Sequence, residues 1–357
     1  MSYPHLTPAH AQLLREGTVI PAHPLALTRE RKLDERRQRL LTQYYINAGA
    51  GGVAVGVHTT QFEIRKPEIN LLEPVLRLAA DQIQQSNLSR PFLKVAGVVG
   101  PTTQALREAE LAVEHGYHLA LVSMGGLNDL SESELITRLE AISAIIPVFG
   151  FYLQPAVGGR LLSYDFWKDA ASLPNLSAIK VAAFNRYQTL DVVRAVCASS
   201  RHEDIALYTG NDDNIVADLL TPYRFHLNGR SIEKRFVGGL LGHWAVWTGA
   251  AVKLLNRIKA SLHDPRAISE LLATGIDVTD MNAAIFDPAH SFHGCIPGIH
   301  EVLRRQGILE GTWCLNPHEK LSPGQLEEID RVCLDYPELT DDAAVKTFLE
   351  TAMTHQY

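Results

Sequence analysis

The stretch GAGGVAVG at residues 49–56 decides between the two folds that this sequence allows. A dinucleotide-binding sheet needs its glycines after a strand and before a helix. Here an amphipathic helical pattern at 34–47 precedes the glycines, and an apolar, β-branched run at 52–57 follows them. Because this order is reversed, the stretch argues against an open dinucleotide-binding sheet and favours a closed barrel.

Short apolar runs alternate with amphipathic stretches on both sides of this point. A strand followed by a helix, repeated eight times, is typical of a (β/α)8 barrel. We therefore predict an α/β fold of the (β/α)8 TIM barrel type. The expected strands are 18–22, 52–57, 91–98, 118–123, 147–152, 177–182, 205–209 and 236–241, and the expected helices lie near 34–47, 71–85, 102–115, 132–145, 164–172, 190–199, 213–220 and 245–258.

The same patterns divide the chain into three parts. Residues 1–16 are expected to form an N-terminal segment, 17–260 the barrel, and 261–357 a C-terminal helical extension. Helical patterns are clear at 299–306 and 323–334, with loops rich in Pro, His and Gly between them. A barrel of this length is usual for the fold, which often takes about 200–250 residues.

The composition is that of an ordinary globular protein. Hydrophobic residues make up 46% of the chain and charged residues 20%, and the net charge of -7 argues against a nucleic-acid partner. The four cysteines form no C-x-x-C motif, and the first residues lack the basic-then-apolar order of a signal peptide. Since glycines break the longest apolar run, 237–252, we expect a cytoplasmic protein with no membrane partner.

Lys180 stands alone in the apolar strand pattern LSAIKVAAF at residues 176–184. Burial disfavours the charged form of lysine and lowers its pKa, which turns the side chain into a nucleophilic amine. The alternative is a structural lysine that reaches solvent or pairs with a carboxylate. Lys180 is the first candidate for a catalytic residue.

Further candidates follow the strands at the end where barrel enzymes carry their chemistry. Tyr152 ends the fifth expected strand, and Lys180 lies within the sixth. A lysine and a tyrosine from neighbouring strands can form a Schiff-base constellation, in which an amine condenses with a ketone while a phenol moves protons. Other residues expected at the same rim are His23, His58, Thr59, Thr60, Gly210 and Asp212, and His23 and His58 are candidates for substrate recognition.

The order and spacing of four motifs resemble the dihydrodipicolinate synthase / N-acetylneuraminate lyase family of class I aldolase-type barrels. The motifs are Thr59-Thr60 after a glycine-rich strand, YLQP at 152–155, Ile179-Lys180, and Gly210 followed two residues later by Asp212. The resemblance runs from about residue 17 to about residue 337 and includes GIHEVLRRQGILEG at 298–311. It implies a Schiff-base-forming lyase or aldolase that acts on a pyruvate-type 2-oxo acid.

The resemblance also implies a role for each matching residue. Lys180 would form an imine with the ketone carbon of the 2-oxo acid, and Tyr152 would be the general acid and base. Thr59 and Thr60 would hold the substrate carboxylate. Because the protonated imine is itself the electron sink, no cofactor is expected; a homo-oligomer, either dimer or tetramer, is expected because the family often forms one.

The chain departs from the family close to these motifs. His58 and Gln61 replace family residues beside the paired threonines, and the loop MGGL at 124–127 offers no phenol for a proton relay. The arginine that follows the strand-five tyrosine is missing, although Arg160 lies slightly later. We therefore expect a divergent member with a different second substrate, whose specificity is set by His23, His58 and Gln61.

Two other functions remain open from the sequence. A non-catalytic barrel that binds or senses 2-oxo acids would explain the missing relay residues, because a fold does not fix a function. A metal-dependent lyase could use His23 and His58, although no carboxylate lies at ligand spacing beside either histidine. Tyr152 and Thr59-Thr60 could equally be ordinary packing and turn residues.

Overall fold

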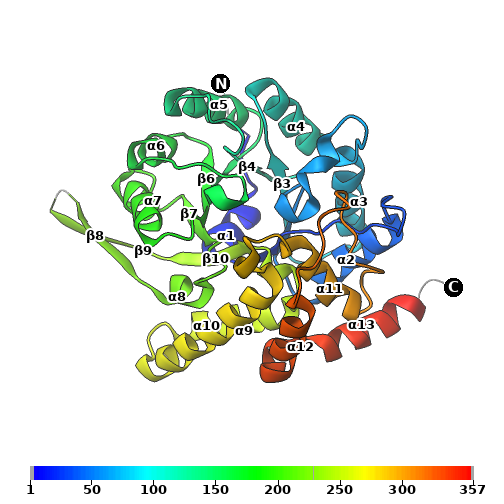
Figure 1. The fold of residues 1–357 in the computed structure, drawn as a ribbon. Helices are drawn as coiled ribbons and strands as arrows, with labels where there is room; N and C mark the ends of the chain where they lie inside the picture. The colour runs from blue at the N-terminus through cyan, green and yellow to red at the C-terminus, as the bar shows by residue number, and fades with distance from the viewer. Residues whose placement is uncertain (1–3, 228, 355–357) are drawn as a thin grey trace. The chain divides into compact units, whose positions relative to one another are not determined.

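The computed structural model describes residues 4–227 and 229–354 and has the predicted (β/α)8 barrel fold, followed by C-terminal helices (Figure 1). All eight predicted strands are present, each within two residues of its expected bounds. They are β1 (Val19–Pro21), β2 (Gly52–Val55), β3 (Leu93–Val98), β4 (Leu119–Val122), β5 (Val148–Leu153), β6 (Leu176–Ala182), β7 (Ala206–Thr209) and β10 (Phe236–Leu241).

The predicted barrel helices are also present and begin at recognisable signals. Ser131 and Glu134 form the capping box that opens one of them, and Asn185 caps the helix that follows β6. The barrel helices are α2 (Glu35–Asn47), α3 (Leu72–Gln85), α4 (Thr102–Glu114), α5 (Glu132–Ser143), α6 (Tyr164–Ala170), α7 (Arg186–Ala198), α8 (Ile215–Leu220) and α9 (Thr248–Ser261), and the later helices are α10 (Pro265–Phe286), α11 (Cys295–Arg305), α12 (Gln325–Asp335) and α13 (Asp342–Thr354).

Four local elements were not predicted individually. A short helix, α1 (Pro8–Glu16), lies in the N-terminal segment, and Leu14 is its one buried residue. An antiparallel hairpin of β8 (Tyr223–Leu227) and β9 (Arg230–Lys234) is inserted before β10 and projects from the strands of its own unit (Figure 1). Its charged, half-exposed positions hide the strand pattern. The helices α10 and α13 likewise had no separate prediction.

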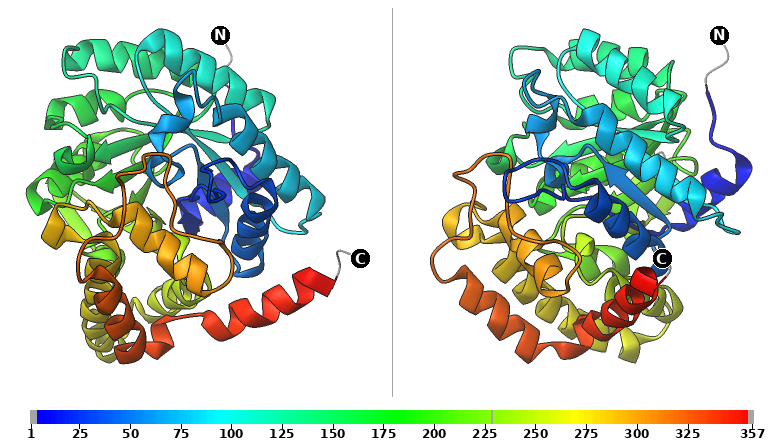
Figure 2. Two further views of the ribbon diagram at one scale, coloured as in Figure 1. Left: turned by 45° about the vertical axis from the view of Figure 1, so that its right-hand side comes forward. Right: turned by 90° about the vertical axis from the view of Figure 1, so that its right-hand side faces the viewer.

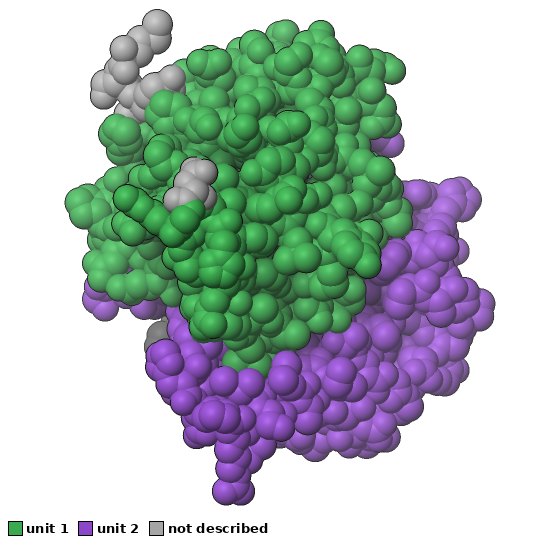
Figure 3. Space-filling model, turned by 90° about the vertical axis from the view of Figure 1, so that its left-hand side faces the viewer, with its two compact units in different colours: residues 1–18, 93–240 green, residues 19–92, 241–357 purple. Residues whose placement is uncertain are grey.

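The chain forms two compact units, which Figure 3 shows in different colours. Unit 1 comprises residues 1–18 and 93–240, and unit 2 comprises residues 19–92 and 241–357. In unit 1 the parallel strands run in the order β3-β4-β5-β6-β7-β10, with α4 to α7 on their outer side (Figure 1). In unit 2 β1 and β2 are adjacent, and the His23 N–H donates to the Ala54 carbonyl at 2.8 Å.

The register of β5 against β6 decides which side chains enter the barrel. Phe151 pairs with Lys180, and Tyr152 pairs with Val181. Paired residues of parallel strands share a face of the sheet, and successive residues alternate between faces. A Cβ at Gly150 would lie 3.4 Å from Trp167 of α6, so Gly150 and Tyr152 face that helix. Phe151 and Lys180 therefore face the interior.

In unit 2 a long connection between α11 and α12 returns to the segments that follow β1 and β2 (orange in Figure 2). The Leu315 N–H donates to Gln61 Oε1 at 2.6 Å, and the Cys314 carbonyl accepts from Arg31 Nε at 2.9 Å. The C-terminal extension thus packs on the loop that carries Thr59 and Gln61.

No helix in the described part of the chain is long and apolar enough to cross a membrane.

Candidate active site

Lys180 is buried on the inner face of β6, where it is 8% exposed. Its Nζ lies 4.4 Å from the centroid of the Phe151 ring on β5, an arrangement that favours a cation over the ring face. Burial lowers the pKa of Lys180 from 10.5 to about 8, while the charge of Asp212 opposes this shift. The predicted environment of Lys180, an amine among apolar strand residues, is present.

Gly210 lets Lys180 pass the end of β7. A Cβ at this position would lie 2.5 Å from Cε of Lys180 and 2.9 Å from Cβ of Ala182. The Gly210 N–H donates to the Val181 carbonyl at 2.7 Å, so the backbone at residue 210 is held beside β6. The glycine is therefore required by the close approach of Lys180, and the structure brings together Lys180, Gly210 and Asp212.

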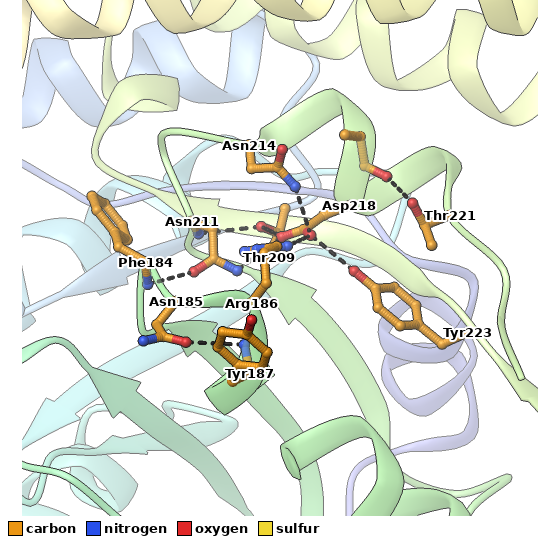
Figure 4. A network of polar contacts seen from close by, with 11 residues as sticks. Phe184, Asn185, Arg186, Tyr187, Thr209, Asn211, Asn214, Asp218, Thr221 and Tyr223 are labelled. Atoms are coloured by element: carbon orange, nitrogen blue, oxygen red, sulfur yellow. Dashed lines mark hydrogen bonds and ion pairs between the residues drawn. The ribbon is translucent and has the colours of Figure 1, made fainter. Parts of the chain in front are cut away.

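A buried carboxylate, Asp218 of α8, anchors the loop after β7 (Figure 4). Asp218 is 0% exposed, and five donors surround it. Arg186 forms an ion pair with it, and hydrogen bonds come from Thr209 Oγ1 at 2.7 Å, Asn211 Nδ2 at 2.9 Å, Asn214 Nδ2 at 3.1 Å and the Tyr223 hydroxyl at 3.0 Å. Such a network stabilises a buried charge by satisfying its lone pairs.

This network also joins the loops that follow β6 and β7. Asn211 Oδ1 accepts from the Phe184 N–H at 3.0 Å while Asn211 Nδ2 donates to Asp218. Arg186 comes from the first turn of α7 and Tyr223 from the hairpin. Asp218 was not predicted from the sequence, because its partners lie up to 32 residues away along the chain. The only signal was a carboxylate inside the short apolar helix IVADLL.

Tyr152 does not face Lys180. Its ring centroid lies 5.4 Å from that of Trp167 on α6. Its hydroxyl is 3.3 Å from both the carbonyl oxygen and the N–H of Leu162. Burial raises the pKa of Tyr152, and the backbone hydrogen bond to Leu162 opposes that effect. The structure thus places Tyr152 on the helix-facing side of β5, and the aromatic residue of β5 that contacts Lys180 is Phe151.

Arg160 does not act as a binding group in this conformation. Its Nη1 donates to the carbonyls of Leu127 and Leu130 at 2.7 and 2.9 Å. The guanidinium therefore holds the loop that follows β4. Nothing in these contacts supports its replacing the family's arginine.

In unit 2, His23 is a buried structural residue. Its Nε2 lies 2.9 Å from Thr42 Oγ1, and its Nδ1 lies 2.8 Å from the Pro24 carbonyl and 3.0 Å from Gln38 Nε2. Burial lowers the pKa of His23 to about 4. Both ring nitrogens are engaged, so the geometry supports neither the predicted contact with substrate nor metal binding by His23.

The two threonines after β2 differ sharply. Thr60 Oγ1 donates to the His23 carbonyl at 2.7 Å and accepts from the N–H groups of Gly56 and Val57 at 3.0 and 3.2 Å. Thr59 Oγ1 is buried and makes no hydrogen bond with any described residue. Thr60 therefore shapes the loop, whereas Thr59 keeps a polar atom available to a ligand.

Gln61 and His58 flank this pair. Gln61 has a φ of 66°, and its Nε2 is buried with no hydrogen bond to the described residues. Positive φ at a residue other than glycine stores strain, which is often found at ligand sites. The half-buried His58 ring lies 6.0 Å from the ring of Phe62. Within residues 4–227 and 229–354, no three His, Cys, Asp or Glu side chains gather in a way that could hold a metal ion.

The fold and this site define a class of protein, namely a (β/α)8 barrel with a buried, inward-facing lysine on its sixth barrel strand. No family model matches the sequence, and no curated protein matches it. Solved structures do match. Dihydrodipicolinate synthase from Oceanobacillus iheyensis is 16% identical, with a TM-score of 0.71 over 92% of this chain and 99% of that one.

Two more matches have the same extent. N-acetylneuraminate lyase from Fusobacterium nucleatum, complexed with pyruvate, is 17% identical, with a TM-score of 0.70 over 90% of this chain and 98% of that one. Dihydrodipicolinate synthase from Aquifex aeolicus is 17% identical, with a TM-score of 0.71 over 91% of this chain and 99% of that one. The resemblance predicted from the motifs is thus confirmed at the level of the fold.

Proposed function

We propose that this protein is a Schiff-base-forming lyase or aldolase with Lys180 as its nucleophile and a pyruvate-type 2-oxo acid as its substrate. The observation that carries the proposal is Lys180 itself, a buried amine whose pKa is lowered to about 8. Near neutral pH such a lysine has a substantial neutral fraction, which an ordinary lysine lacks. The similar fold of a lyase complexed with pyruvate supports the substrate class.

The reaction follows from the properties of an imine. The neutral Lys180 amine attacks the ketone carbon, a C–N bond forms, the carbonyl oxygen leaves as water with the two amine protons, and the imine takes up one proton from solvent. The protonated imine then withdraws electrons from the adjacent carbon and stabilises the enamine formed by C–C cleavage or proton loss. No organic cofactor takes part in these steps. Thr59 and Gln61 are the proposed carboxylate-recognition residues, because each keeps a buried polar atom with no partner among the described residues.

A second candidate is a barrel that binds 2-oxo acids without turning them over. The position of Tyr152 favours it, because the predicted proton-transfer phenol is hydrogen-bonded to Leu162 instead of facing Lys180. A site without a proton-transfer group can bind a keto acid and fail to process it.

Borohydride reduction in the presence of pyruvate, followed by intact-protein mass spectrometry, tests the proposal. The wild-type protein should be trapped as a covalent adduct, and Lys180→Ala should not. Lys94→Ala is the matched control, because Lys94 is another strand lysine whose pKa burial lowers. An adduct that persists in Lys180→Ala contradicts the assignment of the nucleophile. A folded wild-type protein that forms no adduct contradicts Schiff-base chemistry and leaves the binding function.

A further inference from the structure

We propose that Asp212, in place of Tyr152, is the catalytic residue that transfers protons at the Lys180 imine. This inference rests on the proposed Schiff-base function and names the group that completes it.

The strands on either side of β6 offer Lys180 no available hydroxyl within unit 1. On β5 the residue paired with Lys180 is Phe151. On β7 the paired residue is Tyr208, whose hydroxyl donates to the Leu14 carbonyl at 3.0 Å. Tyr152 lies on the opposite face of β5, against Trp167. The protons of imine formation must therefore move through a group that is not a strand tyrosine of this unit.

Asp212 is placed to transfer the protons of imine formation. It is 8% exposed and follows Gly210, whose backbone lies against the Lys180 side chain. Its N–H donates to the Gly210 carbonyl at 3.1 Å, so the chain turns tightly at the amine. Among the described residues, Asp212 is the charged group whose field acts on the pKa of Lys180. The loop thus brings one carboxylate into the electrostatic range of one amine.

The Asp218 network fixes this loop from both sides of Asp212. Asn211 precedes Asp212 and Asn214 follows it by two residues, and both donate to the Asp218 carboxylate. The Asn214 N–H also donates to the Asn211 carbonyl at 2.9 Å. Proton transfer needs a carboxylate held in one position, and side chains locked by a second layer of hydrogen bonds provide it. Asp218 is therefore a positioning residue.

The proposed steps balance. When the neutral Lys180 nitrogen attacks the ketone carbon, the Asp212 carboxylate accepts the proton that the nitrogen loses. The carbinolamine oxygen takes this proton back from Asp212 and a second proton from solvent, the C–O bond breaks, and water leaves the protonated imine. Asp212, again a carboxylate, then removes a proton from C3 of the substrate, and the C–H electron pair forms the C=C bond of the enamine as the C=N pair moves to nitrogen.

Exchange of the pyruvate methyl protons in D2O, followed by NMR, reports this last step without any second substrate. Asp212→Asn should slow the exchange about a hundredfold or more, the usual contribution of general acid–base catalysis. Asp213→Asn, which removes a neighbouring exposed carboxylate of the same loop, and Tyr152→Phe should each stay within about threefold of the wild type. Asp212→Glu should recover part of the lost rate.

Borohydride trapping of the same variants separates the possible failures. The Asp212→Asn protein should still be trapped with pyruvate on long exposure, with its trapping midpoint shifted to lower pH because the Asp212 charge raises the pKa of Lys180. If Asp212→Asn exchanges as fast as Asp213→Asn, the proposal for Asp212 is overturned while the wild-type adduct still supports Lys180. A wild-type protein that forms no adduct overturns both.

Discussion

The loop after β7 and the loop after β2 use their buried polar atoms in opposite ways. In the first, Asp218 receives five donors, and the asparagines on either side of Asp212 are both bound to it. In the second, Thr59 Oγ1 and Gln61 Nε2 are buried with no partner among the described residues. A polar atom buried without a hydrogen bond costs stability. The polar groups of the loop after β7 therefore hold that loop in place, whereas two polar atoms of the loop after β2 remain available for a ligand.

Removing the centre of the satisfied network should have the largest effect on stability. We expect Asp218→Ala to lower the free energy of unfolding by about 3 kcal/mol, because the donors that now bind the buried carboxylate would lose their acceptor. Chemical denaturation measures this change. Asp191→Ala is the control, because it breaks an exposed aspartate–arginine ion pair with Arg194 and should cost less than about 1 kcal/mol. Equal losses in the two variants would contradict an anchoring role for Asp218.

The lowered pKa of Lys180 gives a pH-dependent effect of intermediate size. Its pKa is about 8 in the folded protein and near the ordinary 10.5 in the unfolded chain. Between these values the unfolded chain holds a proton that the folded protein does not, so raising the pH favours folding. The wild type should therefore gain stability from pH 8 to pH 10.5 relative to Lys180→Met, as measured by urea denaturation at several pH values. Parallel curves for the two proteins would show that Lys180 titrates normally.

The barrel could be predicted from the sequence because each strand–helix unit carries its own local signals. The glycine run at 49–56 and the capping box at Ser131 each involve only a few neighbouring residues, so the sequence alone shows where a helix or strand begins or ends. The orientation of Tyr152 could not be predicted in the same way. In a strand, a shift of one residue exchanges the two faces, and the presence of Phe151 next to Tyr152 makes either register plausible from composition alone.

The candidate site shows the same limit. Lys180, Gly210 and Asp212 were predicted and lie together, because Lys180 lies near the end of one strand and the other two residues directly follow the next strand. His23 was predicted at the barrel mouth on the same reasoning, but its ring is engaged by Thr42 and Gln38 of α2. Strand position fixes where a backbone lies, whereas the side chain turns toward whichever partner the tertiary structure supplies. Its contribution to specificity, like that of His58, stays a prediction.

The adjacent threonines offer the finest comparison and the smallest expected change in stability. Valine has the shape of threonine without the hydroxyl. Thr59→Val should leave the free energy of unfolding within about 1 kcal/mol of the wild type, because the hydroxyl that it removes has no partner among the described residues. If that hydroxyl binds a substrate carboxylate, the same variant should raise KM for the 2-oxo acid about tenfold, the value of a hydrogen bond to a charged group.

Thr60→Val is the matched control for this prediction. It removes a hydroxyl that donates to the His23 carbonyl and accepts from two backbone N–H groups, so it should cost about 2 kcal/mol of stability. Denaturation curves and steady-state kinetics on both variants separate the two roles. A Thr59→Val protein that loses as much stability as Thr60→Val, with KM unchanged, would show that both hydroxyls hold the loop. The contrast between the loops would then reduce to the Gln61 amide alone.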